Sequence, residues 1–311
     1  MSQQTIVETK ELTKKYRDFV AVNNLGLRID EGEVFGFLEP NGAGKTTTIL
    51  MLLGLTEPTS GAARVCGYNP TREALKVKRV AGYMPEKIGF YEDLTATENL
   101  EYTAWLNGLS RDTGLKKIDE LLGIVGLGDV ADQKVGKFSH GMKQRLGIAD
   151  VMIKDPKVAF FDEPTSGIDP EGVDQMLSLI KEMARRKVTI VLSSHQLHQV
   201  QKVCNRVGIM AKGRLVVEGA MDLLGRESLA GGKYRIQLQV TKSAPNLVEA
   251  LRGIDGVIGV DGSEDLLFVN CNDDLRPQVA KVVVDSGSLL VQMKIEEYGL
   301  EEIYLKYFRE S

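Results

Sequence analysis

The sequence has few cysteines, no strong charge of either sign and no sustained heptad repeat, and each shortage excludes a class of protein. Its three cysteines, Cys66, Cys204 and Cys271, lie far apart without metal-ligand spacing, which indicates free thiols in a reducing cytosol. The net charge of −4 gives no reason to expect a nucleic-acid partner, although it does not exclude a local basic patch. The lack of heptads excludes a long coiled coil.

Segments that would place the chain in a membrane are also lacking. The N-terminal residues Met-Ser-Gln-Gln-Thr show no basic region followed by an apolar one, so we expect no signal peptide. No apolar run approaches the length of about 20 residues that a membrane-spanning helix needs. Work at a membrane would therefore require a separate, membrane-spanning partner.

Over most of its length the chain alternates apolar runs with helical patterns. Residues 5–10 and 25–38 are predicted to be strands of an antiparallel entry sheet, with turns at Asn23-Asn24 and 30–32 and with Tyr16 in the polar segment between the strands. Strands that alternate with helices favour an α/β fold with a parallel, doubly wound sheet. Further strands are expected at 62–66, 80–84, 158–163, 188–192, 207–210 and 215–217.

Residues from about 90 to 155 form a predicted helical insertion within this α/β pattern. Thr95, with Glu98 three residues later, predicts a capped helix start, and a second helix is expected at 111–125. After the insertion, Asp169 followed by Pro170 predicts the start of another helix. Such an insertion usually adds a binding surface.

The C-terminal part has a different pattern. We expect a linker at 227–232, which separates a first domain of 1–226 from an accessory domain of 233–311. Residues 234–240 alternate with period two, and the following patterns extend the order to strand, helix, two strands, helix, strand and a last helix at 300–309. This order predicts a ferredoxin-like unit. Because we find no cluster of catalytic residue types in it, a regulatory or partner-binding role is expected.

A small, glycine-rich segment between an apolar strand at 34–38 and an apolar helix is the main candidate site. A loop of this kind presents backbone N–H groups to phosphate at a helix N-terminus. Lys45 would reach the outer phosphates of a nucleotide, and the Thr46 hydroxyl would ligate magnesium. The pattern is GxxxxGK[ST], except that Glu39 stands at the first glycine. The predicted ATP-binding residues here are Glu39, Pro40, Asn41, Gly42, Ala43, Gly44, Lys45, Thr46 and Thr47.

A pair of acidic residues at the end of a hydrophobic strand is the second candidate. Asp162 ends the run Phe160-Phe161-Asp162-Glu163 and is placed to hold the magnesium shell, as strand-end aspartates of P-loop enzymes do. Glu163 could orient or deprotonate an attacking water. The alternative is that Glu163 only begins a turn before Pro164.

These elements, together with a third segment, carry a family resemblance. Residues 139–145, Ser-His-Gly-Met-Lys-Gln-Arg, resemble the signature segment of ABC ATPases and stand shortly before the Asp162-Glu163 strand end. Over about residues 5–225 the chain looks like the ATP-binding subunit of an ABC transporter. The resemblance implies that Tyr16 stacks on adenine, although a lone tyrosine is usually just a half-exposed loop aromatic. It also implies a switch histidine at His195 and a D-loop that includes Ser166, Gly167 and Asp169.

The resemblance further implies how such a subunit works. Two subunits would pack head to tail, and the signature residues Ser139, His140 and Gly141 of one would close over the γ-phosphate held by the other. ATP and Mg²⁺ are the implied cofactors, and a separate permease is the implied membrane partner on whose cytoplasmic face the subunit would sit. The implied catalytic residues are Lys45, Glu163 and His195, and the implied magnesium ligands are Thr46, Glu86 and Asp162.

Three residues depart from the family pattern. Besides Glu39, Glu86 replaces the usual Q-loop glutamine, and a carboxylate oxygen there can still ligate magnesium. His140 replaces the first glycine of the signature pair, and we expect its side chain to face solvent at the seam between subunits. The changes at Glu86 and His140 resemble those in ATPases of exporters with an ABC-2 permease. Together with the C-terminal unit, this resemblance favours export of a drug, lipid or polysaccharide.

Two other functions remain open at the level of sequence. Glu39 suggests a regulatory protein that binds nucleotide without hydrolysing it. The presence of both Glu163 and His195 argues against this alternative. A soluble ABC ATPase of translation or DNA repair is the second alternative. Translation factors of this kind carry two cassettes in one chain, whereas this chain has one, and repair proteins insert a long coiled coil.

Overall fold

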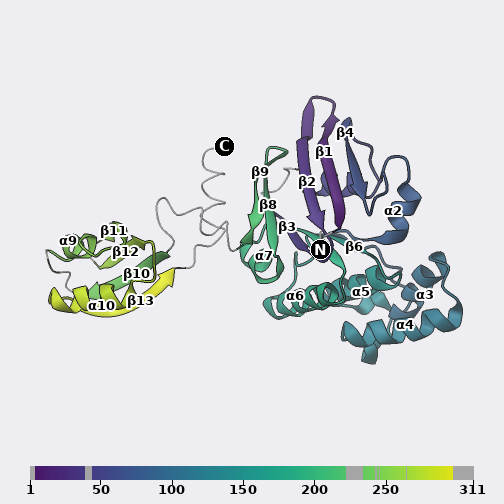
Figure 1. Ribbon diagram of the computed structural model, residues 1–311. Helices are drawn as coiled ribbons and strands as arrows, with labels where there is room; N and C mark the ends of the chain where they lie inside the picture. The colour runs from purple at the N-terminus through teal and green to yellow at the C-terminus, as the bar shows by residue number, and fades with distance from the viewer. Residues whose placement is uncertain are drawn as a thin grey trace. The chain divides into compact units, whose positions relative to one another are not determined.

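The computed structural model describes residues 4–38, 44–221, 234–241, 244, 246–263 and 265–296 (Figure 1). The chain divides into two compact units, Met1–Gly219 and Ala220–Ser311. The linker predicted at 227–232 and the helix predicted at 300–309 lie outside the described residues. No helix within the described ranges is both long and apolar enough to cross a membrane.

A three-stranded antiparallel sheet begins the first unit. Its strands are β1 (Thr5–Tyr16), β2 (Phe19–Asp30) and β4 (Ser60–Val65), in the order β2-β1-β4. The predicted end of the first strand at residue 10 and the predicted turn at Asn23-Asn24 are wrong. Both strands continue through register shifts, where Glu11 and Asn24 take positive φ angles of 51° and 56°. Tyr16 therefore ends a strand, opposite Phe19, instead of lying in a loop.

A six-stranded sheet follows, with its strands in the order β5-β6-β7-β3-β8-β9. The predicted placement of residues 34–38 in the antiparallel sheet is wrong, because β3 (Val34–Leu38) pairs in parallel with β7 and β8. The turn at 31–32, where Gly32 has a φ of 79°, separates β3 from β2. The predicted α/β architecture is confirmed. The other strands are β5 (Ala81–Met84), β6 (Val158–Asp162), β7 (Thr189–Ser194), β8 (Arg206–Ala211) and β9 (Arg214–Ala220).

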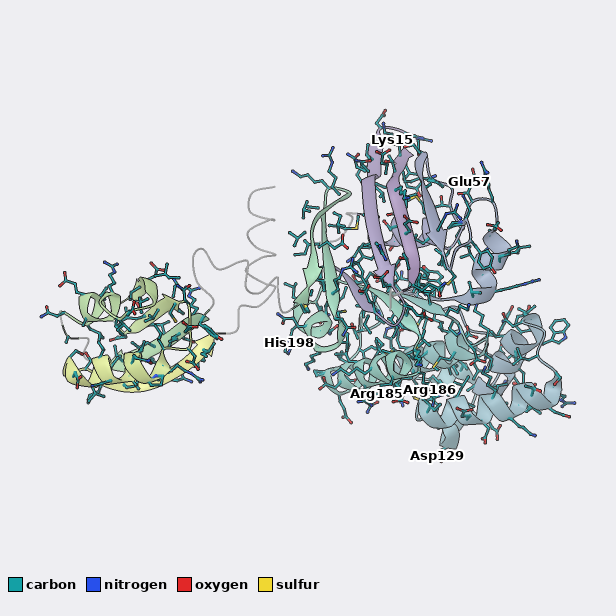
Figure 2. The ribbon with its side chains drawn as sticks, viewed as in Figure 1. Lys15, Glu57, Asp129, Arg185, Arg186 and His198 are labelled. Carbon is teal, nitrogen blue, oxygen red and sulfur yellow. The ribbon has the colours of Figure 1, made fainter. Side chains whose placement is uncertain are left out.

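Two helices of the first unit begin at the capping side chains that the sequence suggested. Thr95 forms the predicted capping box with Glu98, and Asp169 caps the helix that starts at Pro170. Arg186, which is labelled in Figure 2, lies just beyond that helix. Its Nη1 lies 3.2 Å from Glu120 Oε1, and this ion pair connects the helix to the helical insertion. The helices are α1 (Lys45–Leu52), α2 (Ala74–Val80), α3 (Ala96–Leu106), α4 (Arg111–Ile124), α5 (His140–Met152), α6 (Pro170–Arg185) and α7 (Leu197–Val203), with short 3₁₀ turns at Gly128–Val130 and Val135–Lys137.

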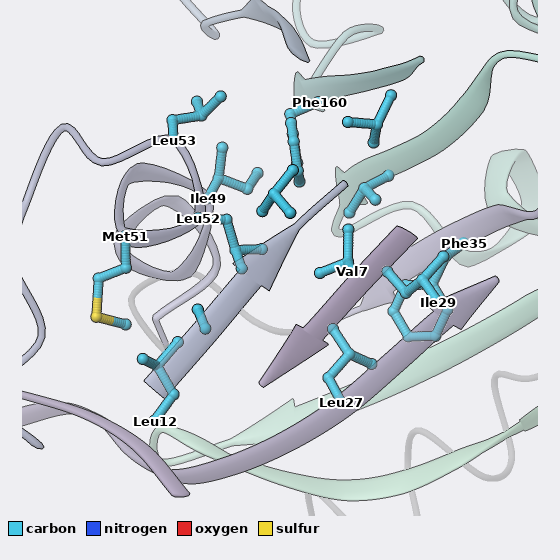
Figure 3. Packing of buried hydrophobic residues seen from close by; sticks show 14 of the residues in the cluster. Val7, Leu12, Leu27, Ile29, Phe35, Ile49, Met51, Leu52, Leu53 and Phe160 are labelled. Carbon is cyan, nitrogen blue, oxygen red and sulfur yellow. The ribbon is translucent and has the colours of Figure 1, made fainter. Parts of the chain in front are cut away.

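The core of the first unit joins the two sheets around α1. Val7 and Leu27 of the antiparallel sheet, Phe35 and Phe160 of the parallel sheet, and Ile49 of α1 belong to one buried cluster (Figure 3). Fully burying side chains of this size stabilises the fold by about 1.5–3 kcal/mol each. The packing holds the N-terminus of α1 at the carboxyl end of β3, which is where the candidate site begins.

Within its described residues, the second unit has the predicted order of strands and helices up to the last strand. Its strands form one antiparallel sheet in the order β11-β12-β10-β13 around an apolar core. The first and third strands of this unit, β10 and β12, thus lie at the centre of the sheet. Its elements are β10 (Tyr234–Thr241), α9 (Leu247–Arg252), β11 (Val257–Ser263), β12 (Leu266–Cys271), α10 (Arg276–Asp285) and β13 (Leu289–Glu296).

The three cysteines are free in the structure. Burial raises the pKa of the Cys66 thiol to about 11, and burial likewise raises the pKa of Cys204. Because the thiolate is the reactive form, a raised pKa makes these two thiols poorer nucleophiles, which fits a packing role.

Candidate functional site

The site begins where β3 ends and α1 starts. Gly44 caps α1 with a φ of 109°, and a Cβ built on it would lie only 2.3 Å from the Ala21 carbonyl oxygen, so the position requires glycine. Lys45 and Thr46 therefore stand in the first turn of a helix whose N–H groups favour anions. Thr47 lies beside them and is half-buried. Residues 39–43 lie outside the described part, so their roles stay predictions.

The Glu163 carboxylate lies between two basic side chains. Its Oε1 pairs with Lys45 Nζ at 2.8 Å, and its Oε2 lies 2.9 Å from His195 Nδ1. Lys45 is 6% exposed and Glu163 is 8% exposed, so this is a buried ion pair whose two charges depend on each other. Glu163 follows β6 and has a positive φ of 49°. Its N–H donates to Ser193 Oγ at 3.0 Å, which helps to hold that uncommon backbone.

Asp162 is fixed from two sides at the end of β6. Its Oδ2 accepts a hydrogen bond from Thr46 Oγ1 at 2.7 Å, and its Oδ1 accepts one from Ser193 Oγ at 2.6 Å. Burial, together with the negative charge of Asp162, raises the pKa of Tyr83 to about 12. Sequence reasoning did not assign Ser193, although its place at the end of an apolar run, like that of Asp162, was the available signal. The parallel register pairs the two residues directly.

The oxygen atoms of Thr46 and Asp162 are of the kind that binds a magnesium ion. Mg²⁺ prefers oxygen ligands and usually binds through one or two carboxylates together with substrate phosphates and water. Thr46 and Asp162 supply a hydroxyl and a carboxylate at hydrogen-bond distance of each other. Glu86 has an exposed side chain, and its carbonyl oxygen accepts a 3.4 Å hydrogen bond from Gln144 Nε2. Its role as a magnesium ligand stays a prediction.

A second group of predicted residues gathers at the N-terminus of α5. Ser139 caps this helix by accepting from Met142 N–H at 3.2 Å. His140 is exposed, as expected from the sequence, but its ring is also held within the chain, because Nε2 lies 2.9 Å from the carbonyl oxygen of Ser166. Gly141 and the segment 166–168 are close neighbours, since a Cβ on Gly141 would lie 3.5 Å from Ile168 Cγ2. The predicted signature and D-loop segments therefore touch in one chain.

Two other predicted residues have local surroundings that bear on their roles. Asp169 Oδ1 accepts from Gly172 N–H at 2.9 Å, so the side chain has a structural role as a helix cap. Tyr16 is 46% exposed, and Lys14 Nζ lies 5.0 Å from the centroid of its ring. Stacking of this ring on adenine stays a prediction.

Comparison with known proteins shows the family. The family model described as ABC transporter matches residues 22–166. The chain is 38% identical over 305 residues to the bacitracin transport ATP-binding protein BcrA of Bacillus licheniformis, with 97% of each chain covered. It is 40% identical over 311 residues to the uncharacterized ABC transporter ATP-binding protein YhcH of Bacillus subtilis (strain 168), covering 99% of this chain and 97% of that protein. The chain therefore belongs to the family of ABC transporter ATP-binding proteins.

A more distant relative and a solved structure agree with this assignment. The chain is 36% identical over 218 residues to the Nod factor export ATP-binding protein I of Burkholderia pseudomallei (strain 1710b), covering 70% of this chain and 72% of that one. A structure titled as the ATP-binding subunit of an ABC transporter superposes with a TM-score of 0.66 at 31% identity, covering 72% of this chain and 93% of the other. The fold of the first unit is thus that of an ABC ATPase cassette.

Proposed function

We propose that this protein is the ATP-hydrolysing motor subunit of a membrane exporter. The observation that carries the proposal is the arrangement around Glu163, whose carboxylate lies between Lys45 and His195 beside the linked pair of Thr46 and Asp162. A phosphate-binding lysine, an oxygen pair for magnesium and a carboxylate base within one site are the parts that ATP hydrolysis needs.

Each side chain has a distinct task in this proposal. Lys45 binds the outer phosphates, and Thr46 and Asp162 hold magnesium, which would neutralise charge that develops on the phosphates. Once Lys45 has moved to phosphate, Glu163 Oε1 is free to accept a proton from water, and His195 keeps the carboxylate oriented through Oε2. Transition-state stabilisation then comes mainly from positioned charges, because the protein has little covalent chemistry to perform.

The signature residues would act on a second subunit. Ser139 caps the N-terminus of α5, where free N–H groups and the helix dipole favour an anion such as a γ-phosphate. In the proposed head-to-tail dimer, this terminus closes over nucleotide held by the partner's Lys45 and Thr46. ATP would then join the two subunits, and hydrolysis followed by phosphate release would separate them. The partner is either a second copy or a sister cassette.

Names of relatives support export as the direction of transport. One relative is named for bacitracin transport and another for Nod factor export. We propose that the present protein likewise drives a separate permease from the cytoplasmic face of the cell membrane, with a drug, lipid or polysaccharide as cargo.

Transport in membrane vesicles tests this proposal. Inside-out vesicles that contain this chain together with a candidate permease, to be sought among the coding sequences beside its gene, are expected to accumulate a fluorescent peptide antibiotic only with MgATP. Vesicles with the permease alone provide the control. If the purified chain hydrolyses ATP but neither binds these vesicles nor supports uptake, the transporter function is wrong and a soluble ABC ATPase is supported.

The residue at position 39 leads to a separate prediction. Glutamate stands where the pattern has glycine, and a carboxylate near polyphosphate is repulsive unless it points away. Glu39→Gly is expected to lower the Kd for MgATP by about threefold to tenfold, because each nearby like charge contributes about 1 kcal/mol in water. Isothermal titration calorimetry measures the change. Glu39→Gln separates charge from backbone freedom, and an unchanged or weaker affinity in both variants contradicts the prediction.

A further inference from the structure

The first turn of α5 packs against the backbone of the turn that follows Glu163. His140 Nε2 lies 2.9 Å from the carbonyl oxygen of Ser166, and a Cβ built on Gly167 would lie 3.4 Å from the same ring nitrogen. Gly167 has a φ of 72°, so the turn already uses a conformation that side chains rarely adopt. The histidine ring thus lies directly on a tightly turned segment.

The direction of the hydrogen bond follows from the groups around the ring. A carbonyl oxygen can only accept, so His140 Nε2 must carry the proton that it donates to Ser166. The amide nitrogen of Gln144 lies 3.5 Å from the same ring nitrogen but is itself a donor, and it is directed to the Glu86 carbonyl oxygen. The Nε2 proton of His140 is therefore donated to the Ser166 carbonyl oxygen. The contact requires the Nε2–H form of the ring, which can be measured.

Ser166 in turn is bonded to the backbone of Glu163. The N–H of Ser166 donates to the Glu163 carbonyl oxygen at 3.1 Å, while the N–H of Glu163 donates to Ser193. Glu163 has a positive φ of 49°, and a backbone of this kind persists only where its surroundings hold it in place. The hydrogen bond from His140 adds a contact from outside the turn, which links α5 to the backbone that directs the Glu163 carboxylate.

We propose that His140 is a positioning residue for hydrolysis, which ties the signature segment to the turn that carries Glu163. The inference rests on the proposed function, in which α5 of one subunit closes over the partner's nucleotide while Glu163 serves its own. His140 then stands between the two nucleotide sites and transmits closure at one to the geometry of the other. Glycine at this position would have no side chain for this contact.

Three substitutions test the role of the ring nitrogen. His140→Ala removes the donor, His140→Asn has an amide too short to reach Ser166, and His140→Gln places an amide nitrogen as many bonds from Cα as Nε2 is. Loss of one hydrogen bond predicts that kcat falls about fivefold in the alanine and asparagine variants, with KM for MgATP changed by less than about twofold. The glutamine variant is expected to recover kcat to within about twofold of wild type. His198→Ala, which removes an exposed histidine of α7, serves as the matched control (Figure 2).

A spectroscopic measurement tests the contact without hydrolysis. Nitrogen NMR of protein labelled at its three histidines, with His140→Ala for assignment, is expected to show His140 in the Nε2–H form. A wild-type kcat in His140→Ala, or a glutamine variant as slow as the alanine one, overturns the inference and leaves the proposed function intact. An Nδ1–H ring at His140 overturns it as well. A wild-type protein that binds but never hydrolyses ATP overturns the proposed function and with it the role of His140.

Discussion

Replacing Glu163 by glutamine is expected to lower kcat for ATP hydrolysis by about 10²–10⁴, the usual contribution of a positioned general base. The amide cannot accept the proton of the attacking water, but it fills the same space between Lys45 and His195. Nucleotide therefore still binds, and the ATP-bound dimer accumulates because hydrolysis no longer separates it. Phosphate release measures the first effect, and light scattering with saturating MgATP measures the second.

The control for this variant distinguishes loss of the general base from loss of one negative charge elsewhere on the protein. Glu171→Gln makes the same chemical change at an exposed residue in the first turn of α6 and is expected to leave kcat and dimerisation as in wild type. A Glu163→Gln protein that remains monomeric with saturating MgATP contradicts the head-to-tail mechanism. One that hydrolyses at the wild-type rate contradicts the assignment of the base.

Replacing Lys45 by alanine is expected to raise the Kd for MgATP by at least about a hundredfold. Each hydrogen bond between charged groups contributes about 1.5–3 kcal/mol, and 1.4 kcal/mol is tenfold in affinity, so loss of contacts to two phosphate oxygens reaches this size. The substitution also leaves the buried Glu163 carboxylate with His195 as its remaining described partner. Isothermal titration calorimetry with MgATP measures the loss.

Lys181→Ala, at an exposed position of α6, is the matched control for Lys45→Ala. Circular dichroism and thermal unfolding show whether Lys45→Ala keeps the fold, since removal of one partner of a buried pair destabilises by about 3–5 kcal/mol. Lys45→Met, which restores apolar volume without charge, provides a second variant if the alanine protein unfolds. Retained affinity for MgATP in a folded variant contradicts the role of Lys45 in phosphate binding.

The parts of the fold that the sequence predicted well depend on local chemistry. The capping box of Thr95 and Glu98, and Asp169 followed by Pro170, act within one helical turn, so their effects are visible in a few neighbouring letters. Asp162 was identifiable because an apolar run ended at it, and parallel strands bring such ends to one edge of a sheet. These signals do not depend on which strands are neighbours in space.

The missed features depend on partners far apart in the sequence. The apolar pattern of residues 34–38 suits either sheet, and only pairing with β7 and β8 decides between them. Strands β1 and β2 continue past the predicted strand end and turn because their pairing shifts in register. The polar residues at these positions do not reveal such shifts in the sequence. Ser193 was missed because its partners Asp162 and Glu163 lie at and just beyond the end of another strand, and the hydrogen bond of His140 spans 26 positions.

In the proposed function, the buried pair of Lys45 and Glu163 means that the site contains its own competitor for the nucleotide. Entering phosphate cannot simply add to an unoccupied ammonium group; it must displace a carboxylate that already neutralises Lys45 at 2.8 Å. The contribution of Lys45 to the binding free energy is then the difference between its interaction with phosphate and its interaction with Glu163. Because Glu163→Gln weakens the second interaction, this variant should bind MgATP more tightly than wild type. In that proposal the same displacement releases Oε1 for the water, so that substrate recognition and activation of the base would be one exchange reaction.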